Sequence, residues 1–359
     1  MVSNVVIDAD VHEANMALDK IGPDDKRLEH KFATVKGHRW HYISCAVPSG
    51  ILQKGTVVLV HGFPDLWLAW RYQVPLLLSL GFQCIILECM GYGQTGAPND
   101  LSLYGFKAHA DAIAGISKAE GVSRIILGGH DWGGAVVYRV AQWQPELVSH
   151  VFSVATPYQP VHDKYLSNEV VAKLLPNFGY QQQFGSADGK IEAVVKGKDM
   201  TKKFLRGMYG GRLSSRRTLM EPETGVNLQA IQKDDIGPSP FFSEEELDYY
   251  TSQYCVSNPE TPMKGPCNWY RTRKVNFDDE KNLPAAQKNG VSQPVLFIQA
   301  LQDNVLIPKM SEGMEETCPK LTRGEVKASH WALWHASGEV NDLVKKWFEA
   351  VVLGGKSKL

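Results

Sequence analysis

The chain has 359 residues, 43% hydrophobic and 21% charged, so it can bury a sizeable core in one large domain or two smaller ones. Its 38 basic side chains are balanced by 39 acidic ones, which argues against a polyanion-binding surface and against nucleic acid as a partner. The six cysteines form no Cys-x-x-Cys pair, and no apolar run resembles a signal peptide or reaches the roughly eighteen residues of a membrane span. We therefore expect a soluble, non-secreted protein with reduced thiols.

Short β-rich runs alternate with helical ones along the chain. An antiparallel hairpin is expected at 32–35 and 40–45, followed by strands at 56–61, 82–88, 124–127, 148–155 and 295–298. Helices are expected at 104–120, 133–143 and 339–351. This alternation predicts an α/β protein with a mostly parallel sheet.

The alternation lapses between about 157 and 282, where helix-like and polar stretches are rich in Gly, Pro, Tyr and Phe. Strand rhythm resumes at Gln293. We interpret this segment as a helical cap inserted after the sixth strand. The predicted division is a first core part at 1–157, the cap at 158–285, and a second core part with a C-terminal tail at 286–359.

A glycine-rich motif, Gly91-Tyr-Gly93-Gln-Thr-Gly96, fits G-x-G-x-x-G and follows a predicted strand. A dinucleotide-binding site would need a helix to continue from it and present its N-terminus to pyrophosphate. Pro98 and the turn-prone Asn99-Asp100 follow at once. The motif is therefore interpreted as a turn after a strand, and no organic cofactor is expected.

The strand at 124–127 runs into Gly128-Gly-His-Asp-Trp-Gly-Gly134, and an apolar helix follows. This is the strand-turn-helix setting of a nucleophile elbow, with Asp131 at the central position. A carboxylate there can attack a saturated carbon and form an ester that water later cleaves, which suits opening of epoxides or displacement of halide. The alternative is a structural Asp that caps the following helix.

Two backbone N–H groups are candidates for an oxyanion hole. His61-Gly-Phe-Pro64 ends the first buried strand, where Phe63 would supply one donor. The N–H of Trp132, directly after Asp131, would supply the second.

Late in the chain, Asp303 follows the strand at 295–298, and His330 follows the run 324–329. The order nucleophile, acid, histidine matches that of α/β-hydrolases. His330 is the predicted base, and Asp303 the acid that orients it. His335 is the second candidate for the base, whereas the elbow should turn His130 away from the pocket.

These motifs together resemble the soluble epoxide hydrolases, and the resemblance extends from about 32 to 353. The segment that begins His61-Gly-Phe-Pro-Asp-Leu-Trp is similar to the family's oxyanion segment, and Gly129-His-Asp-Trp-Gly133 to its nucleophile turn. The resemblance implies an α/β-hydrolase fold, with an eight-stranded sheet, helices on both faces and a helical cap. Vertebrate members carry a separate N-terminal phosphatase domain, which we do not expect here.

The family also places two cap tyrosines over the nucleophile, where they hold the epoxide oxygen and protonate it. Asn268-Trp-Tyr-Arg271 matches one of these segments and indicates Tyr270, and Phe178-Gly-Tyr-Gln181 matches the other and indicates Tyr180. Tyr249, Tyr250 and Tyr254 are alternatives that could equally pack a cap helix. The implied substrate pocket contains Phe63, Pro64, Trp132, Phe178, Gln181, Trp269 and Trp331.

The predicted activity is hydrolysis of a small-molecule epoxide by water to a vicinal diol, with neither metal nor cofactor. A dehalogenase would share the Asp, His and acid but grip halide with groups such as Trp, and Trp132 and Trp269 leave that alternative open. A ligand-binding member with an inactive site is a third possibility, against which the complete set of catalytic residues argues.

The last three residues, Ser357, Lys358 and Leu359, match a peroxisomal address. The sequence therefore predicts recognition by a peroxisomal import receptor and a location in peroxisomes, the cytoplasm or both. The alternative is a frayed, charged tail.

Overall fold

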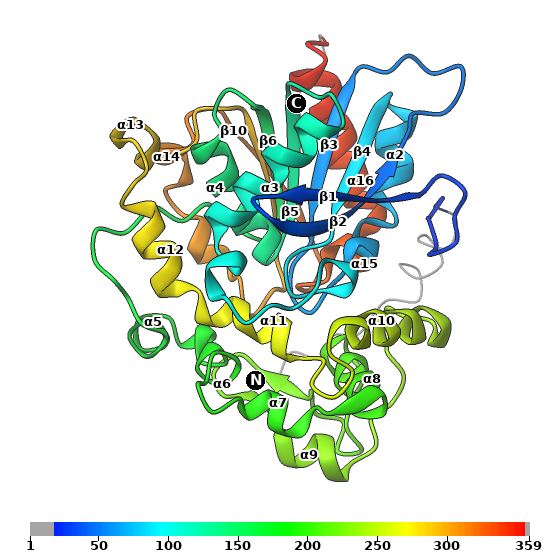
Figure 1. Cartoon of the computed structure of the whole chain (residues 1–359), viewed down its shortest axis with the longest axis vertical. Coiled ribbons are helices and arrows are strands. Elements are labelled where there is room, and N and C mark those ends of the chain that lie inside the picture. Colours follow the sequence, from blue (N-terminus) through cyan, green and yellow to red (C-terminus); the bar gives the residue numbers. More distant parts are fainter. Residues whose placement is uncertain (1–17, 356–359) are drawn as a thin grey trace.

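The computed structural model describes residues 18–355. Its main sheet has eight strands in the order β1-β2-β4-β3-β5-β6-β9-β10 (Figure 1). β1 is antiparallel to β2 and β2 to β4, whereas all later neighbours are parallel. The strands are β1 (Glu29–Val35), β2 (His38–Cys45), β3 (Gly55–Val60), β4 (Phe82–Leu87), β5 (Ile125–His130), β6 (Val148–Val154), β9 (Val295–Ala300) and β10 (Leu321–Val326).

The sheet is covered by helices on both faces, as a parallel sheet requires. α3 and α4 pack together on one face, and α2 and α16 pack together on the other (Figure 1). In α3, the buried residues Ala112, Ile113 and Ile116 form an apolar stripe of helical period. The core helices are α2 (Gln73–Ser79), α3 (Phe106–Ala119), α4 (Trp132–Trp143), α14 (Met314–Thr317), α15 (Ala332–His335) and α16 (Ser337–Trp347).

A helical insertion separates β6 from β9 and lies beyond one end of the sheet (Figure 1). Its longest helices are α8 and α10, and α10 begins with a capping box between Ser243 and Glu246. The elements between β6 and β9 are α5 (Asn168–Leu174), α6 (Gln181–Phe184), α7 (Lys190–Val194), α8 (Gly197–Met208), β7 (Met220–Glu221), β8 (Gly225–Val226), α9 (Leu228–Lys233), α10 (Glu244–Ser257), α11 (Lys264–Asn268), α12 (Arg273–Glu280) and α13 (Ala285–Lys288).

Single helical turns link these elements at several points. They are η1 (Trp67–Trp70), η2 (Gly93–Thr95), η3 (Leu101–Tyr104), η4 (Pro176–Phe178), η5 (Trp269–Arg271), η6 (Pro308–Ser311) and the π-turn η7 (Phe348–Val352). The glycine motif at 91–96 falls in η2 and its flanks, so no long helix follows β4 there. Within residues 18–355, no helix has the length and apolar character needed to cross a bilayer.

The sequence located most of these elements. The predicted hairpin and the strands at 56–61, 82–88, 124–127, 148–155 and 295–298 correspond to β1 through β6 and β9. β10 was not assigned to a specific segment, because it is a partly exposed edge strand with Arg323 and Glu325 at exposed positions. The predicted boundary at 285 coincides with the first residue of α13, and the division into domains stays a prediction.

Candidate active site

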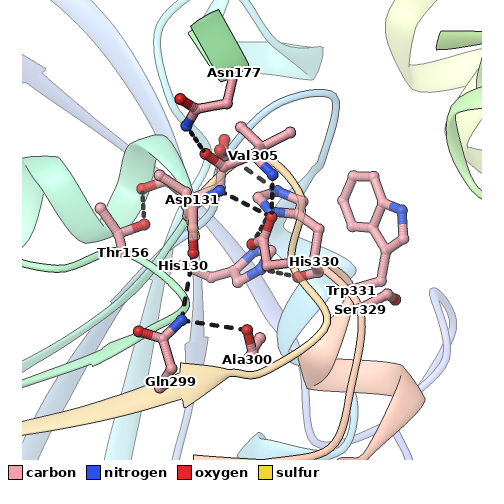
Figure 2. Close-up of polar contacts among 12 residues, drawn as sticks. His130, Asp131, Thr156, Asn177, Gln299, Ala300, Val305, Ser329, His330 and Trp331 are labelled. Carbon is pink, nitrogen blue, oxygen red and sulfur yellow. Dashed lines mark hydrogen bonds and ion pairs between the residues drawn. The ribbon is translucent and has the colours of Figure 1, made fainter. Parts of the chain in front are cut away.

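Asp131 lies on a strained turn between β5 and α4. Its backbone has φ 53° and ψ −126°, a conformation that residues with a side chain rarely adopt. The Asp131 carbonyl accepts a hydrogen bond from the Thr156 hydroxyl at 2.7 Å (Figure 2). It also accepts the Gly134 N–H at 2.9 Å, and the two bonds hold the turn. A side chain at Gly133 would meet the Val60 carbonyl oxygen at 2.0 Å, so only glycine lets α4 start this close to β3.

The two oxygens of the Asp131 carboxylate have different partners. Oδ1 accepts a hydrogen bond from the Phe63 N–H at 2.7 Å, and Oδ2 lies 3.5 Å from His330 Nε2. A Cβ at Gly62 would sit 2.4 Å from Asp131 Oδ1, so glycine allows the loop after β3 to reach the carboxylate. Among residues 18–355, the Trp132 N–H makes no hydrogen bond to this carboxylate, and its role as a second donor stays a prediction.

Asp303 and His330 come from the loops after β9 and β10 and meet beside Asp131. His330 Nδ1 lies 2.7 Å from Asp303 Oδ2, and the other Asp303 oxygen accepts the N–H groups of Val305 and Leu306 at 2.8 and 2.9 Å (Figure 2). The structure therefore brings together the three residues that the sequence selected from separate loops. All three follow the carboxyl ends of parallel strands, where sites of α/β sheets form.

Burial and two carboxylates compete over the protonation of His330. Burial favours the neutral imidazole, but the charges and hydrogen bonds of Asp303 and Asp131 outweigh it and raise the pKa of His330 to about 10. Burial also opposes ionisation of Asp303, yet the neighbouring His330 and two backbone N–H groups hold the pKa of that carboxyl below its ordinary value. The resting site is thus an imidazolium between two carboxylates.

The other histidine candidates point elsewhere. His130 Nε2 lies 2.8 Å from the His330 carbonyl oxygen, so the His130 ring holds the backbone of His330 (Figure 2). Burial, reinforced by the charge of His330, lowers the pKa of His130 to about 4, so the ring is neutral and can donate this bond. His335 Nδ1 accepts the Ser329 N–H at 3.0 Å and contacts neither carboxylate of the site.

Tyr180 and Tyr270 lie side by side, with ring centroids 5.8 Å apart, and both are buried. They come from the start of α6 and from η5. Burial, together with the charge of Asp131, raises the pKa of both hydroxyls, so both stay protonated. The phenols are therefore able to act as hydrogen-bond and proton donors.

The alternative tyrosines have structural contacts instead. Tyr250 donates to Asp65 Oδ1 at 2.8 Å, and Tyr249 accepts the Trp67 indole N–H at 3.0 Å. Tyr254 is buried, and its hydroxyl has no hydrogen-bond partner within the described part of the chain. None of these three lines either cavity that contains Asp131.

Two cavities, of about 340 and 490 Å³, meet at Asp131 and Tyr180, which line both. The smaller cavity has an apolar wall that consists of Val171, Leu174, Leu175, Phe178, Leu306 and Met310. Trp132 and Gln181 also line it. The larger cavity contains the remaining groups of the site, which are Phe63, Tyr270, Asp303, His330 and Trp331.

Two predicted pocket residues, Pro64 and Trp269, line neither cavity. The Trp269 indole N–H donates to the Met90 carbonyl at 2.8 Å, which turns the ring edge into the core. The Pro64 carbonyl accepts the Tyr209 hydroxyl at 2.8 Å and ties the loop after β3 to the insertion. Neighbours on a turn point in different directions, so the roles of Pro64 and Trp269 in the substrate pocket stay predictions that the two cavities do not support.

The chain matches the model of the alpha/beta hydrolase fold family over residues 55–337. Epoxide hydrolase srdG of Neurospora crassa is 37% identical over 93% of this chain and 99% of its own length. The chain belongs to the epoxide hydrolase family. Bifunctional epoxide hydrolase 2 of the rat is 31% identical over 92% of this chain. The match spans only 57% of the rat protein.

Solved structures show that the fold is shared. An epoxide hydrolase from an endophytic Streptomyces aligns with a TM-score of 0.75 at 24% identity. The alignment covers 92% of the present chain and 98% of the Streptomyces chain. One from Vigna radiata aligns with a TM-score of 0.73 at 22% identity, over 90% of this chain and 98% of its own.

The sequence missed a polar cluster behind Tyr180 in this epoxide hydrolase family member. Arg273, at the start of α12, donates to Gln181 Oε1 at 2.6 Å and to Asn168 Oδ1 at 2.5 Å. The sequence could have indicated Arg273, because a basic residue three positions after Tyr270 lies about one helical turn away. Within residues 18–355, no group of His, Cys, Asp or Glu side chains is arranged to hold a metal ion.

Proposed function

We propose that this protein hydrolyses epoxides to vicinal diols through a covalent ester on Asp131. The observation that carries the proposal is the position of the Asp131 carboxylate. One oxygen is held by the Phe63 N–H, the other faces His330, and Tyr180 and Tyr270 line the same space. An epoxide between these groups would have a nucleophile on one side and two proton donors on the other.

In the first step, Asp131 Oδ2 attacks an epoxide carbon as the carbon–oxygen bond of the ring breaks. The released electron pair stays on the epoxide oxygen, which takes a proton from Tyr180 or Tyr270 and leaves a tyrosinate. The products of this step are an alkyl ester on Asp131 and a free hydroxyl on the adjacent carbon. The apolar wall of the smaller cavity would exclude water while the bond forms.

In the second step, His330 removes a proton from water, and the hydroxide attacks the acyl carbon of Asp131. Negative charge then collects on the former Oδ1, which already accepts the Phe63 N–H. Collapse releases the diol oxygen, which takes the proton from His330. The proton of the regenerated carboxylic acid returns to the tyrosinate, so the net change is the addition of one water.

The charge of Asp131 would couple the two steps. In the resting site Asp131 is one of two carboxylates that raise the pKa of His330. Esterification removes that charge, so the pKa of His330 falls, and the imidazolium releases its proton to solvent and becomes the base that activates water. His330 takes a proton back from solvent when the Asp131 carboxylate forms again, which restores the resting site. Asp303 remains ionised and keeps the ring oriented.

The dehalogenase alternative is not favoured. A halide site would use indole N–H donors near Asp131, but one of the two candidates, Trp269, donates to the Met90 carbonyl and lines neither cavity. Two phenols line the space instead, and a phenol can transfer a proton to an alkoxide, whereas a departing halide needs none.

The test is a single turnover of styrene oxide with enzyme in excess in ¹⁸O-water. An Asp131 ester predicts an unlabelled first diol and heavy oxygen in the peptide that contains Asp131. A labelled diol with an unlabelled peptide would exclude covalent catalysis. Asp131→Asn is the control and should form no ester, and chloride release from a chloroalkane would favour the dehalogenase.

We also propose that Ser357, Lys358 and Leu359, which lie outside the described residues, address the protein to peroxisomes. A fluorescent reporter that ends in the last ten residues of the chain should enter peroxisomes. The same reporter without Ser357, Lys358 and Leu359 should stay cytoplasmic. An identical distribution of both reporters would contradict the proposal.

A further inference from the structure

A partly buried cation, Arg273, lies behind Tyr180. Arg273 lines the smaller cavity together with Tyr180, and burial lowers its pKa because the charged form loses water. Its two hydrogen-bond partners, Gln181 and Asn168, are neutral amides. Within residues 18–355, no carboxylate forms an ion pair with Arg273. A charge that has lost hydration and has no counter-ion lowers the stability of the fold, so the position of Arg273 beside Tyr180 calls for a functional explanation.

Arg273 fixes the orientation of the Gln181 amide. A guanidinium can only donate hydrogen bonds, so the amide atom 2.6 Å from Arg273 Nη2 must be the oxygen. The amide nitrogen then faces the Tyr180 hydroxyl at 3.4 Å, and it can only donate. Tyr180 therefore accepts from Gln181, which leaves its own proton free. A flipped amide would present its oxygen and capture that proton.

The same cluster joins the segments that carry both tyrosines. Asn168 accepts from Arg273 through Oδ1 and donates through Nδ2 to the carbonyls of Tyr270 at 2.9 Å and Gln181 at 3.3 Å. A Cβ at Gly185 would lie 2.5 Å from Asn168 Nδ2, so glycine makes room for this bridge. Asn168 thus holds the two tyrosine segments together, and Arg273 orients the one amide that faces Tyr180.

The charges around Tyr180 have opposite effects on its ionisation. Burial and the carboxylates of Asp131 and Asp303 raise the pKa of Tyr180, whereas Gln181 and Arg273 lower it. Tyr270, whose ring is 5.8 Å away, is a neutral neighbour in the resting site. Arg273 is therefore a positive charge that opposes the two negative ones when Tyr180 gives up its proton.

We propose that Arg273 is a positioning residue for proton donation by Tyr180, acting through the Gln181 amide. The inference rests on the proposed function. As the Asp131–carbon bond forms and the epoxide carbon–oxygen bond breaks, the proton of Tyr180 passes to the epoxide oxygen. The phenolate left behind accepts the Gln181 N–H, which Arg273 polarises from the other end of the amide. The partly buried guanidinium is in place before the reaction, so no reorganisation is needed when charge appears.

The experiment compares Arg273→Met with a matched control, Lys274→Met, which removes an exposed charge from the same turn of α12. In single turnovers with styrene oxide, Arg273→Met should slow epoxide consumption by about 10-fold, as for loss of one charge-assisted hydrogen bond. Binding of the neutral epoxide and hydrolysis of the ester should be unchanged. Lys274→Met should behave as the wild type.

The decisive measurement places Arg273→Met in a Tyr180→Phe background. If Arg273 acts through Tyr180, Arg273→Met should slow epoxide consumption little further in a protein that already carries Tyr180→Phe. Equal slowing in both backgrounds would overturn the inference, as would a selective loss of affinity for epoxides that carry a carboxylate. Failure of the wild type to turn over any epoxide would instead refute the proposed function.

A second variant covers the case in which Arg273→Met does not fold. Gln181→Glu keeps a partner for Arg273 and turns the group that faces Tyr180 from a donor into an acceptor. It should therefore slow epoxide consumption without loss of thermal stability. Unchanged epoxide consumption in Gln181→Glu would overturn the inference.

Discussion

His330 is held between two carboxylates, and its protonation should report on both. Its pKa of about 10 lies above the ordinary value of 6.5, so the imidazolium stabilises the fold fully below pH 6.5, and that contribution is lost as pH rises through 10. Asp131→Asn removes one of the two carboxylates that raise the pKa of His330, so that pKa should fall. An NMR titration of the imidazole would measure it. His109, whose pKa burial lowers to about 4, is the internal reference, and an unchanged titration of His330 would contradict this account.

The tyrosine pair permits a matched comparison among phenols. Tyr270→Phe or Tyr180→Phe should slow ring opening by roughly 10- to 10⁴-fold, the range for loss of a positioned acid, and the double variant should nearly abolish it. Tyr254→Phe is the control, because that hydroxyl is buried without a partner in the described chain and lies outside both cavities. Rapid-quench measurement of the ester decides the matter. A normal rate in Tyr180→Phe would show that the assignment of the cap tyrosine is wrong.

At the scale of elements, the sequence predicted best those segments whose conformation allows few residue types. The buried run of β3 and the Asp131 turn were predictable because a central strand and a tight elbow restrict composition strongly. Edge strand β10 and the direction of the Trp269 ring were not, since both depend on neighbours distant in the chain. Arg273 was missed for the same reason: its partners lie 92 and 105 residues away.

The contact between α4 and β3 sets the position of the elbow. A methyl group at Gly133 would lie 2.0 Å from the Val60 carbonyl oxygen, and backbone atoms cannot turn aside. Gly133→Ala should therefore lower the free energy of unfolding by about 1–3 kcal/mol or more, the cost of overpacking, and reduce ester formation. A methyl group at Gly338 in α16 would meet only the Leu18 side chain, at an ordinary contact distance of 4.0 Å, so Gly338→Ala should be neutral or slightly stabilising. Equal urea midpoints for the two variants would contradict the prediction.

At the scale of the whole molecule, the insertion is attached to the core close to the site. Tyr209 donates to the Pro64 carbonyl, and Tyr250 of α10 donates to Asp65, two residues beyond the oxyanion donor Phe63. On the other side of the site, a buried ion pair joins Arg139 of α4 to Glu280 of α12 at 2.7 Å. The nucleophile and the tyrosines belong to different parts of the chain, so these contacts set the distance between them.

Asp65 makes this attachment dependent on pH. Burial raises the pKa of Asp65 to about 7, although the Leu66 N–H and the Tyr250 hydroxyl favour its ionised form. The folded state therefore holds a proton that the unfolded chain releases near pH 3.8, so stability falls as pH rises from about 4 to 7 and then levels off. Asp65→Asn cannot ionise and should lack this loss, which is of the order of 4 kcal/mol for a shift of this size. Urea unfolding of both proteins from pH 4 to 8 measures the difference, with Asp342→Asn, exposed on α16, as the control. Parallel stability curves for the wild type and Asp65→Asn would show that Asp65 is ionised throughout and that Tyr250 binds a buried carboxylate.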